Sequence, residues 1–270
     1  MTLRRGDLRL TDGSRMDWLR IGNGPLPVVV VPGAADGLWT VRQTALLLAW
    51  RHRHRFRTHR LLILGRREPM PSGFGVERLA DDYLHAVERL RWGASTWECT
   101  SAGGPIGQWA AARRPDLVRG LILVSTMSRP NQTLLEVLET WRNLTHARRW
   151  TDLYWSMIEL NRRPSALARF TPLRPLVRMI PRPRNPQRFV RLLDGLVSVD
   201  TRPILPAIAC PTLVIGGEAD RIVSAELQRE LASLIPNSRL VLYKGYGHAA
   251  SVEHPDYERA TRSFVRMLRI

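Results

Sequence analysis

The chain has 270 residues, of which 44% are apolar, and it carries a formal net charge of +17 at pH 7. This length suits one large domain or a domain with an insertion, and the apolar content supports a real core and argues against disorder. No run of eighteen apolar residues occurs, which argues against a membrane span.

The first residues, MTLRRGDLRLTDGS, carry charges but no apolar stretch behind them, so we expect no secretory signal. The two cysteines, Cys99 and Cys210, are too few for a disulfide framework in a chain of this length. We therefore expect both to be buried thiols in a reducing compartment, and the protein to be cytoplasmic. We find no metal-binding or cofactor motif and expect neither group.

The positive charge comes almost entirely from arginine, since Lys244 is the only lysine. Such a charge would normally suggest nucleic acid or an anionic surface as a partner. The arginines are spread along the chain, and their densest cluster is RHRHRFR at residues 51–57. No zinc-finger spacing, RNA-binding aromatic signature or heptad accompanies it. We interpret this cluster as a solvated loop and expect no specific nucleic-acid partner.

The first half of the chain alternates β-prone and helix-prone segments. A hairpin is expected at the start, from two β-prone runs on either side of the turn DGS at residues 12–14. The runs VVVV at 28–31 and LLIL at 61–64 are typical of strands buried on both faces of a parallel sheet. Helices are predicted over about residues 39–50 and 76–90, the second from apolar residues at helical spacing.

The alternation is interrupted once, after a strand expected at residues 121–124. Residues 127–206 lack strand-like runs, are rich in Trp and Arg, and are broken by prolines, which predicts an inserted helical region. The runs TLVI at 212–215 and LVLY at 240–243 resume the pattern, each followed by a helix. The sequence predicts a doubly wound α/β sheet, built from residues 1–126 and 207–270.

Ser101 stands in the segment CTSAGGPIG, residues 99–107, between a β-prone run and a helix-forming one. One interpretation is a strand that ends in a glycine-rich turn, where serine is common. The other is a nucleophile on a strained strand-to-helix turn. Such a turn needs small residues two positions before and two after the serine, because the backbone folds back on itself. The segment alone does not decide between them.

Asp220 and His248 also follow predicted strands. Because ligands of open parallel sheets bind beyond the carboxyl ends of the strands, we expect both side chains and Ser101 at one edge. A serine hydroxyl is a weak nucleophile, and an imidazole held by a buried carboxylate can accept its proton. Taken singly, Asp220 could cap a turn and His248 could cap the last helix or bond within the core. All three at one edge would then be a coincidence.

These motifs resemble those of the α/β-hydrolase fold family over nearly the whole chain. The matching pieces are VVVVPG at 28–33, CTSAGG at 99–104, CPTLVIGGEADRIV at 210–223 and GYGHAASVEHPD at 245–256. The resemblance implies an eight-stranded, mostly parallel sheet with the helical insertion as a lid. It also implies a nucleophile at Ser101, an orienting acid at Asp220, a general base at His248, and an oxyanion hole from the backbone N–H groups of Ala34 and Ala102.

The chain departs from the family pattern at three places. Pro32-Gly33 stands where most members have His-Gly, and Cys99 stands where most have glycine. The usual Asp-x-Arg-Gly after the fourth strand is replaced by LGRR at residues 64–67, which we interpret as a loop variant. Because the oxyanion hole uses the amide of Ala34, the change at Pro32 affects the support of the site and not its donors.

A serine nucleophile forms an acyl-enzyme, so we expect a carboxylesterase-like serine hydrolase whose partner is a small molecule. The substrate is expected to be a fairly hydrophobic carboxylic ester, or a related thioester, lactone or C–C substrate. Candidates for lining the substrate are Trp39, Trp141, Trp155 and Met157, although packing within the lid is the alternative for most of them. The alternative function, suggested only by Pro32-Gly33, is a non-catalytic ligand-binding member that keeps the triad.

Overall fold

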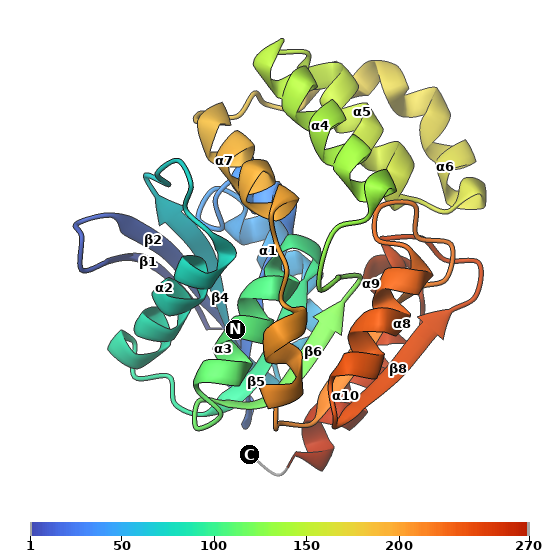
Figure 1. Cartoon of the computed structure of the whole chain (residues 1–270). Coiled ribbons are helices and arrows are strands. Elements are labelled where there is room, and N and C mark those ends of the chain that lie inside the picture. Colours follow the sequence, from blue (N-terminus) through green and yellow to red (C-terminus); the bar gives the residue numbers. More distant parts are fainter. Residues whose placement is uncertain (1, 269–270) are drawn as a thin grey trace.

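The computed structural model describes residues 2–268, which form an eight-stranded sheet with helices on both faces and a helical segment above one end (Figure 1). The strand order is β1-β2-β4-β3-β5-β6-β7-β8. The pairs β1–β2 and β2–β4 are antiparallel, and the other pairs are parallel. The predicted mostly parallel eight-stranded α/β sheet is confirmed.

Every predicted strand is present, and most extend beyond the apolar run that predicted them. The strands are β1 Leu3–Arg9, β2 Arg15–Ile21, β3 Leu26–Val31, β4 His59–Glu68, β5 Ser95–Thr100, β6 Val118–Val124, β7 Thr212–Gly217 and β8 Ser238–Tyr243. The interpretation of residues 64–67 as a loop variant is wrong. These residues continue β4, because β2 pairs with it as far as Glu68.

The helices of the sheet layer are α1 Ala45–Arg51, α2 Val76–Arg89, α3 Gly104–Arg113, α8 Ala225–Leu234, α9 Ala250–Glu253 and α10 Tyr257–Met267, with short 3-10 turns η1 Ala34–Gly37, η2 Arg53–Arg55 and η3 Ser101–Gly103. The helix predicted from about residue 39 begins only at Ala45. Thr40 and Gln43 exchange backbone-to-side-chain hydrogen bonds of 2.8 and 3.3 Å, which form a turn ahead of it.

The run of valines in β3 is buried on both faces of the sheet, as the sequence predicted. Val29 and Val31 pack in the core that contains α2, α3 and α8. Val28 and Val30 pack in the core on the opposite face, which contains α1 and α10. The period of two along a strand sends successive side chains to opposite faces, so a fully apolar strand needs cover on both.

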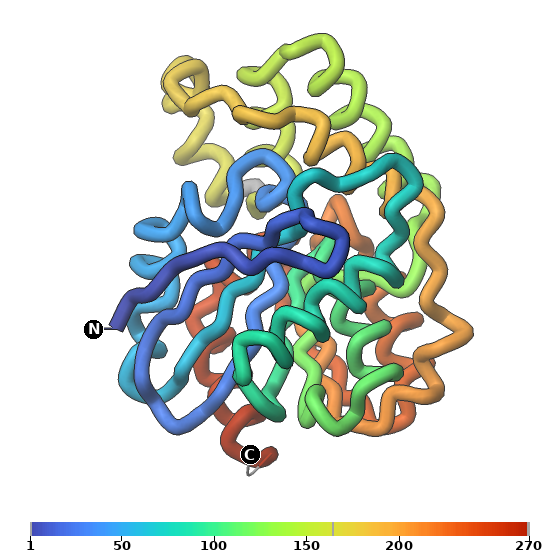
Figure 2. The backbone as a smooth tube through the Cα atoms, turned by 90° about the vertical axis from the view of Figure 1, so that its left-hand side faces the viewer, coloured from blue at the N-terminus to red at the C-terminus, as the bar shows by residue number. Residues whose placement is uncertain are grey.

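Between β6 and β7 the chain forms only helices, namely α4 Gln132–His146, α5 Trp150–Asn161, α6 Pro164–Phe170, η4 Thr171–Met179, α7 Pro186–Val197 and η5 Arg202–Ala207. Figure 2 shows most of this segment, from green-yellow to orange, as a layer above the sheet. Asn131 caps α4 by accepting a hydrogen bond from the amide of Leu134 at 2.9 Å. No helix within residues 2–268 is both long and apolar enough to cross a membrane.

Candidate active site

Ser101 lies at the sharp turn between β5 and α3. Its φ is +50°, in the left-handed region that a residue with a Cβ rarely adopts. The hydroxyl of Thr126 donates to the Ser101 carbonyl at 2.8 Å and fastens the turn to the end of β6. A strained serine at the carboxyl end of a central strand has the backbone geometry that exposes a nucleophile.

Small residues around Ser101 are required by close contacts. A Cβ at Gly103 would lie 2.6 Å from the Val31 carbonyl oxygen. A Cβ at Gly104 would collide with the side chain of Thr126, and one at Gly107 with the sulfur of Cys99. The helix after the serine therefore packs directly against the strands. Cys99 is buried, and burial raises the pKa of its thiol well above the ordinary value, so it is held as an unreactive thiol.

The structure brings Ser101, His248 and Asp220 together. His248 Nε2 lies 3.0 Å from Ser101 Oγ, and His248 Nδ1 lies 2.7 Å from Asp220 Oδ2. The side chain of Asp220 is fully buried and that of His248 is 9% exposed. The three residues come from loops after β5, β7 and β8, at the edge of the sheet where the sequence placed them.

The loop after β7 holds the Asp220 carboxylate in place. Oδ1 accepts hydrogen bonds from the amides of Ile222 and Val223 at 2.8 and 2.9 Å, which leaves Oδ2 for His248. Asp220 is therefore a turn residue and the partner of the histidine at once. The cap of α8 is Ser224, which accepts from the amide of Leu227 at 3.4 Å.

The backbone around His248 is fixed by two other segments. Ser125 Oγ donates to the His248 carbonyl at 3.1 Å. The amide of Ala249 donates to the carbonyl of Asn161, at the end of α5, at 2.9 Å. Near the same point Arg162 pairs with Glu253 at 3.0 Å. The helical segment and the histidine loop are thus joined beside the site.

The amides of Ala34 and Ala102 have no hydrogen-bond acceptor among the described residues. Ala34 begins η1 directly after Gly33, and Ala102 follows Ser101. A Cβ at Gly33 would lie 3.5 Å from the Cβ of Ser101, so the two turns are in contact. Two free backbone donors beside a serine hydroxyl match the arrangement that stabilises an oxyanion.

A buried ion cluster that sequence reasoning missed supports the turn before Ala34. Arg66 donates to the carbonyls of Pro32 and Gly33 at 2.8 and 2.9 Å. Asp36 accepts from the Arg66 guanidinium at 3.3 Å and from Arg188 of α7 at 2.8 Å. All three charged side chains are at most 3% exposed. The segment LGRR, residues 64–67, was the one sequence feature that could have indicated this cluster. The carboxylate that pairs with Arg66 lies far away in sequence, so the segment alone does not predict it.

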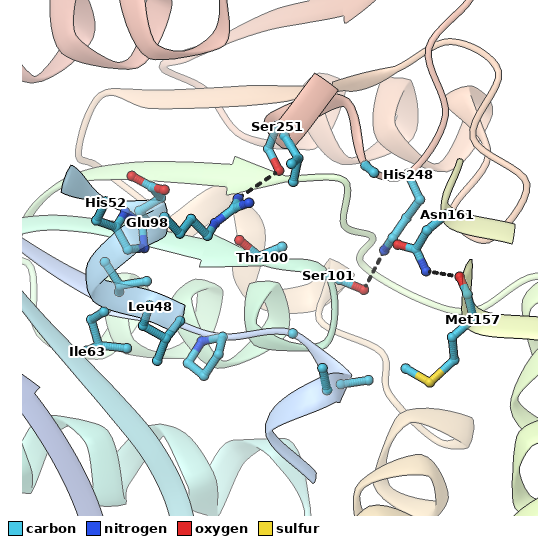
Figure 3. Close-up of a pocket in the computed structure, with 18 of the residues that line it drawn as sticks. Leu48, His52, Ile63, Glu98, Thr100, Ser101, Met157, Asn161, His248 and Ser251 are labelled. Atoms are coloured by element: carbon cyan, nitrogen blue, oxygen red, sulfur yellow. Dashed lines mark hydrogen bonds between the residues drawn. The ribbon is translucent and has the colours of Figure 1, made fainter. Parts of the chain in front are cut away.

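A cavity of about 310 Å³ opens at Ser101 and His248 (Figure 3). Trp141 and Met157 contribute to its lining. Trp39 and Trp155 lie outside that lining. Trp39 packs against Tyr154, with 5.1 Å between ring centroids, and Trp155 stacks against the guanidinium of Arg174 at 5.4 Å. The sequence could not tell which tryptophans of the helical segment face the site.

The interpretation of residues 51–57 as a solvated loop is wrong for part of the cluster. The Arg55 side chain is 1% exposed, and it pairs with Glu98 of β5 at 2.7 Å. His52 is buried beside this pair, and burial together with the charge of Arg55 lowers its pKa to about 3. Glu98 and His52 line the cavity of Ser101. Within residues 2–268 no group of His, Cys, Asp and Glu could hold a metal ion.

A family model for the alpha/beta hydrolase fold matches residues 27–255, and the chain belongs to this family. Among curated proteins, the chain is 31% identical over 265 residues to the polyketide synthase ThaQ of Burkholderia thailandensis. This match covers 96% of the chain but only 12% of that much longer protein. It is 27% identical over 256 residues to a protein named as a carbamate hydrolase, RutD, of Klebsiella pneumoniae, covering 85% of the chain and 87% of RutD.

Solved structures share the fold at lower identity. A thermophilic esterase from Thermogutta terrifontis superposes with a TM-score of 0.76 at 23% identity, over 99% of this chain and all of that one. An enol-lactonase from Burkholderia xenovorans gives 0.75 at 20% identity, over 97% and 99% of the two chains. The fold and the family are those of the α/β hydrolases.

Proposed function

We propose that the chain is a serine hydrolase that cleaves a small, fairly hydrophobic carboxylic ester through an acyl-enzyme. The observation that carries the proposal is the continuous path from Asp220 through His248 to Ser101, with separations of 2.7 and 3.0 Å. The path ends on a serine with a positive φ beside two unpartnered amides. A ligand-binding role alone would not require this arrangement.

In this mechanism His248 Nε2 takes the proton of Ser101 as Oγ attacks the ester carbonyl carbon. The carbonyl oxygen becomes an oxyanion that accepts hydrogen bonds from the amides of Ala34 and Ala102. The intermediate collapses as the alcohol leaves with the proton from His248. Water then attacks the acyl-serine with the same proton transfers and releases the carboxylic acid, which restores Ser101. Asp220 holds the imidazole in the reactive tautomer and stabilises its positive charge.

The volume of the cavity and the residues that line it favour a small acyl substrate. About 310 Å³ is at the lower end of ligand pockets. We further propose that residues 127–206 act as a lid, which contributes Trp141 and Met157 to the site.

The RutD relatives favour carbamates as a second substrate class, cleaved by the same attack at a carbonyl carbon. Two free buried thiols fit a cytoplasmic location.

The test is fluorophosphonate labelling followed by a panel of 4-nitrophenyl esters and carbamates. We expect one label, on Ser101, and ester turnover that falls by several orders of magnitude in Ser101→Ala with the fold intact. Cys99→Ala is the matched control because it removes the buried thiol two residues before Ser101 and should keep both label and turnover. Near-wild-type turnover in Ser101→Ala would make the assignment wrong.

A further inference from the structure

The cavity at Ser101 has a second polar end. Its lining runs from Ser101 and His248 past Thr100 to His52 and Glu98, and Figure 3 shows these groups at opposite sides of the view. The far end lies between the C-terminal turn of α1 and the short helix α9. The proposed reaction uses none of the polar groups there.

Arg51, the last residue of α1, is a half-buried guanidinium that lines this far end. Its Nη2 donates to Ser251 Oγ of α9 at 3.3 Å, which is a long hydrogen bond. No carboxylate within residues 2–268 lies within 4.0 Å of it, whereas the nearby Arg55 is paired at 2.7 Å. A guanidinium has five N–H donors, so Arg51 retains most of its capacity for an acceptor.

Glu98 does not neutralise Arg51, because its carboxylate is already occupied. One oxygen accepts from Arg55 at 2.7 Å, and the other accepts from the hydroxyl of Tyr257 at 3.2 Å. Burial raises the pKa of Glu98, but the charge of Arg55 and its hydrogen bond, with further contributions from His52 and Arg51, together hold the pKa below the ordinary value. The hydrogen-bonding positions of Glu98 are therefore filled, and Arg51 acts on this carboxylate only at longer range, which leaves the Arg51 N–H donors for the cavity.

His52 provides a second, independent observation that points to a ligand at this end. Its side chain lines the same end of the cavity, the residue is 5% exposed, and its Nδ1 has no hydrogen-bond partner among the described residues. A buried polar atom without a partner is destabilising, because it loses its hydrogen bonds to water and gains none in the protein. A neutral imidazole can donate from one ring nitrogen, so an oxygen-bearing ligand would satisfy it.

The rest of the cavity wall includes apolar side chains, namely Leu48, Ile63, Val30 and Val252. Figure 3 shows Leu48 and Ile63 on the same side of the view as His52. A short methylene chain would be covered by such side chains, while a charged group would be desolvated there without a partner. The cavity thus combines a reactive end with a far end where a guanidinium lies among apolar side chains.

We propose that the Arg51 end is a carboxylate subsite, so that the preferred substrate is an ester with a free carboxylate a few methylenes from the bond cleaved at Ser101. Arg51 would hold the carboxylate by charge-assisted hydrogen bonds, with Ser251 and His52 as further donors. This inference rests on the proposed hydrolase function. It adds the substrate class, which an apolar lining alone would not specify.

The test compares esters that differ only in one charge. One pair, 4-nitrophenyl glutarate and 4-nitrophenyl valerate, carries the charge on the acyl side. The other, the acetate ester of 4-hydroxybutanoate and butyl acetate, carries it on the alcohol side. We expect kcat/KM to favour the charged member of one pair by about tenfold or more, the scale of a hydrogen bond to a charged group. The pair that shows the preference identifies the part of the substrate that reaches Arg51.

Arg51→Gln should remove that preference, measured as the ratio of kcat/KM for the charged and neutral esters, and Arg51→Lys should restore part of it. Arg53→Gln is the matched control, because it removes the same charge from an exposed residue that stacks on Trp50 at 4.4 Å. The preference should also survive about 0.5 M NaCl, which screens the long-range attraction of the basic surface but not a partly buried contact.

Equal rates for both members of each pair in the wild type would overturn the subsite, even if Arg51→Gln did not fold. A preference that Arg51→Gln leaves intact, or that Arg53→Gln also removes, would overturn it as well. Failure of the hydrolase proposal is distinct, because it would appear as neutral-ester turnover that Ser101→Ala does not reduce.

Discussion

Replacing Arg66 by methionine is expected to reduce turnover as well as stability. The Arg66 side chain is fully buried and donates to the carbonyls of Pro32 and Gly33 at 2.8 and 2.9 Å. A hydrogen bond from a charged donor contributes about 1.5–3 kcal/mol, so loss of both should lower the free energy of unfolding by about 3–6 kcal/mol. Asp36 keeps its second partner, Arg188, so no carboxylate is left alone.

The catalytic effect follows from the position of these two carbonyls directly before Ala34. Without Arg66 the turn is free to rotate, and the Ala34 amide is no longer aimed at the proposed oxyanion. Loss of one such donor costs about 10²–10³ in turnover. We therefore expect kcat on a neutral 4-nitrophenyl ester to fall by about this factor with little change in KM. Arg66→Lys keeps the charge but not the two guanidinium nitrogens that donate to the two carbonyls, and should recover only part of the rate.

Arg67→Met is the control that separates positioning from stability. Arg67 is the next residue of β4, is also buried, and pairs with Asp12 and Asp82 instead of the turn before Ala34. Its loss should lower the urea midpoint while kcat of the folded protein stays near the wild-type value. If folded Arg66→Met keeps the wild-type kcat, the oxyanion turn does not depend on Arg66.

Three further predictions concern pH, the acid and the tight turn. Burial lowers the pKa of His52 from 6.5 to about 3, so only the unfolded chain gains its proton between these values. The contribution of neutral His52 to the free energy of unfolding is complete above this range and is smaller by about 2 kcal/mol at about pH 5. Urea unfolding should therefore show a weaker dependence of this free energy on pH in His52→Gln than in the wild type. The same dependence in both proteins would contradict the prediction. Asp220→Asn should lower kcat by about 10⁴, while Glu218→Gln in the same loop should not; the reverse result would move the acid to Glu218. Gly103→Ala places a Cβ 2.6 Å from a backbone carbonyl oxygen and should cost about 1–3 kcal/mol by thermal unfolding, unlike Gly75→Ala, which meets open space; equal melting points would refute the packing argument.

Hydrophobic periodicity was sufficient to predict the central strands because they are buried on both faces of the sheet. The valines of β3 alternate between two cores, so neither face tolerates a polar residue and the run stands out. The start of α1 was predicted less well. The hydrogen bonds between Thr40 and Gln43 form a turn in place of the first helical turn, so the helix begins later than the apolar pattern indicates. Hydrophobic periodicity predicts which face of a helix is buried, but it does not predict the residue at which the helix begins.

The meeting of Ser101, Asp220 and His248 was predictable for a topological reason. Each follows a parallel strand, and parallel strands place their carboxyl ends at one edge, so chain order was enough to bring the three together. The lining of the cavity had no such rule. Which of several tryptophans faces the site depends on how α4 and α5 pack, and that is decided by contacts with α7 and the histidine loop.

Buried arginines were the features least accessible to sequence. In a chain with 41 Lys and Arg and 24 Asp and Glu residues, LGRR departs from the family pattern, but nothing local shows that Arg55 or Arg66 is buried. Their burial depends on single carboxylates, since Glu98 receives Arg55 and Asp36 receives Arg66. Both carboxylates lie within three residues of a proposed catalytic group, Glu98 before Ser101 and Asp36 after Ala34. A buried charge persists only where its partner is held in place, so these pairs fix the two backbone segments that the proposed chemistry needs to be rigid.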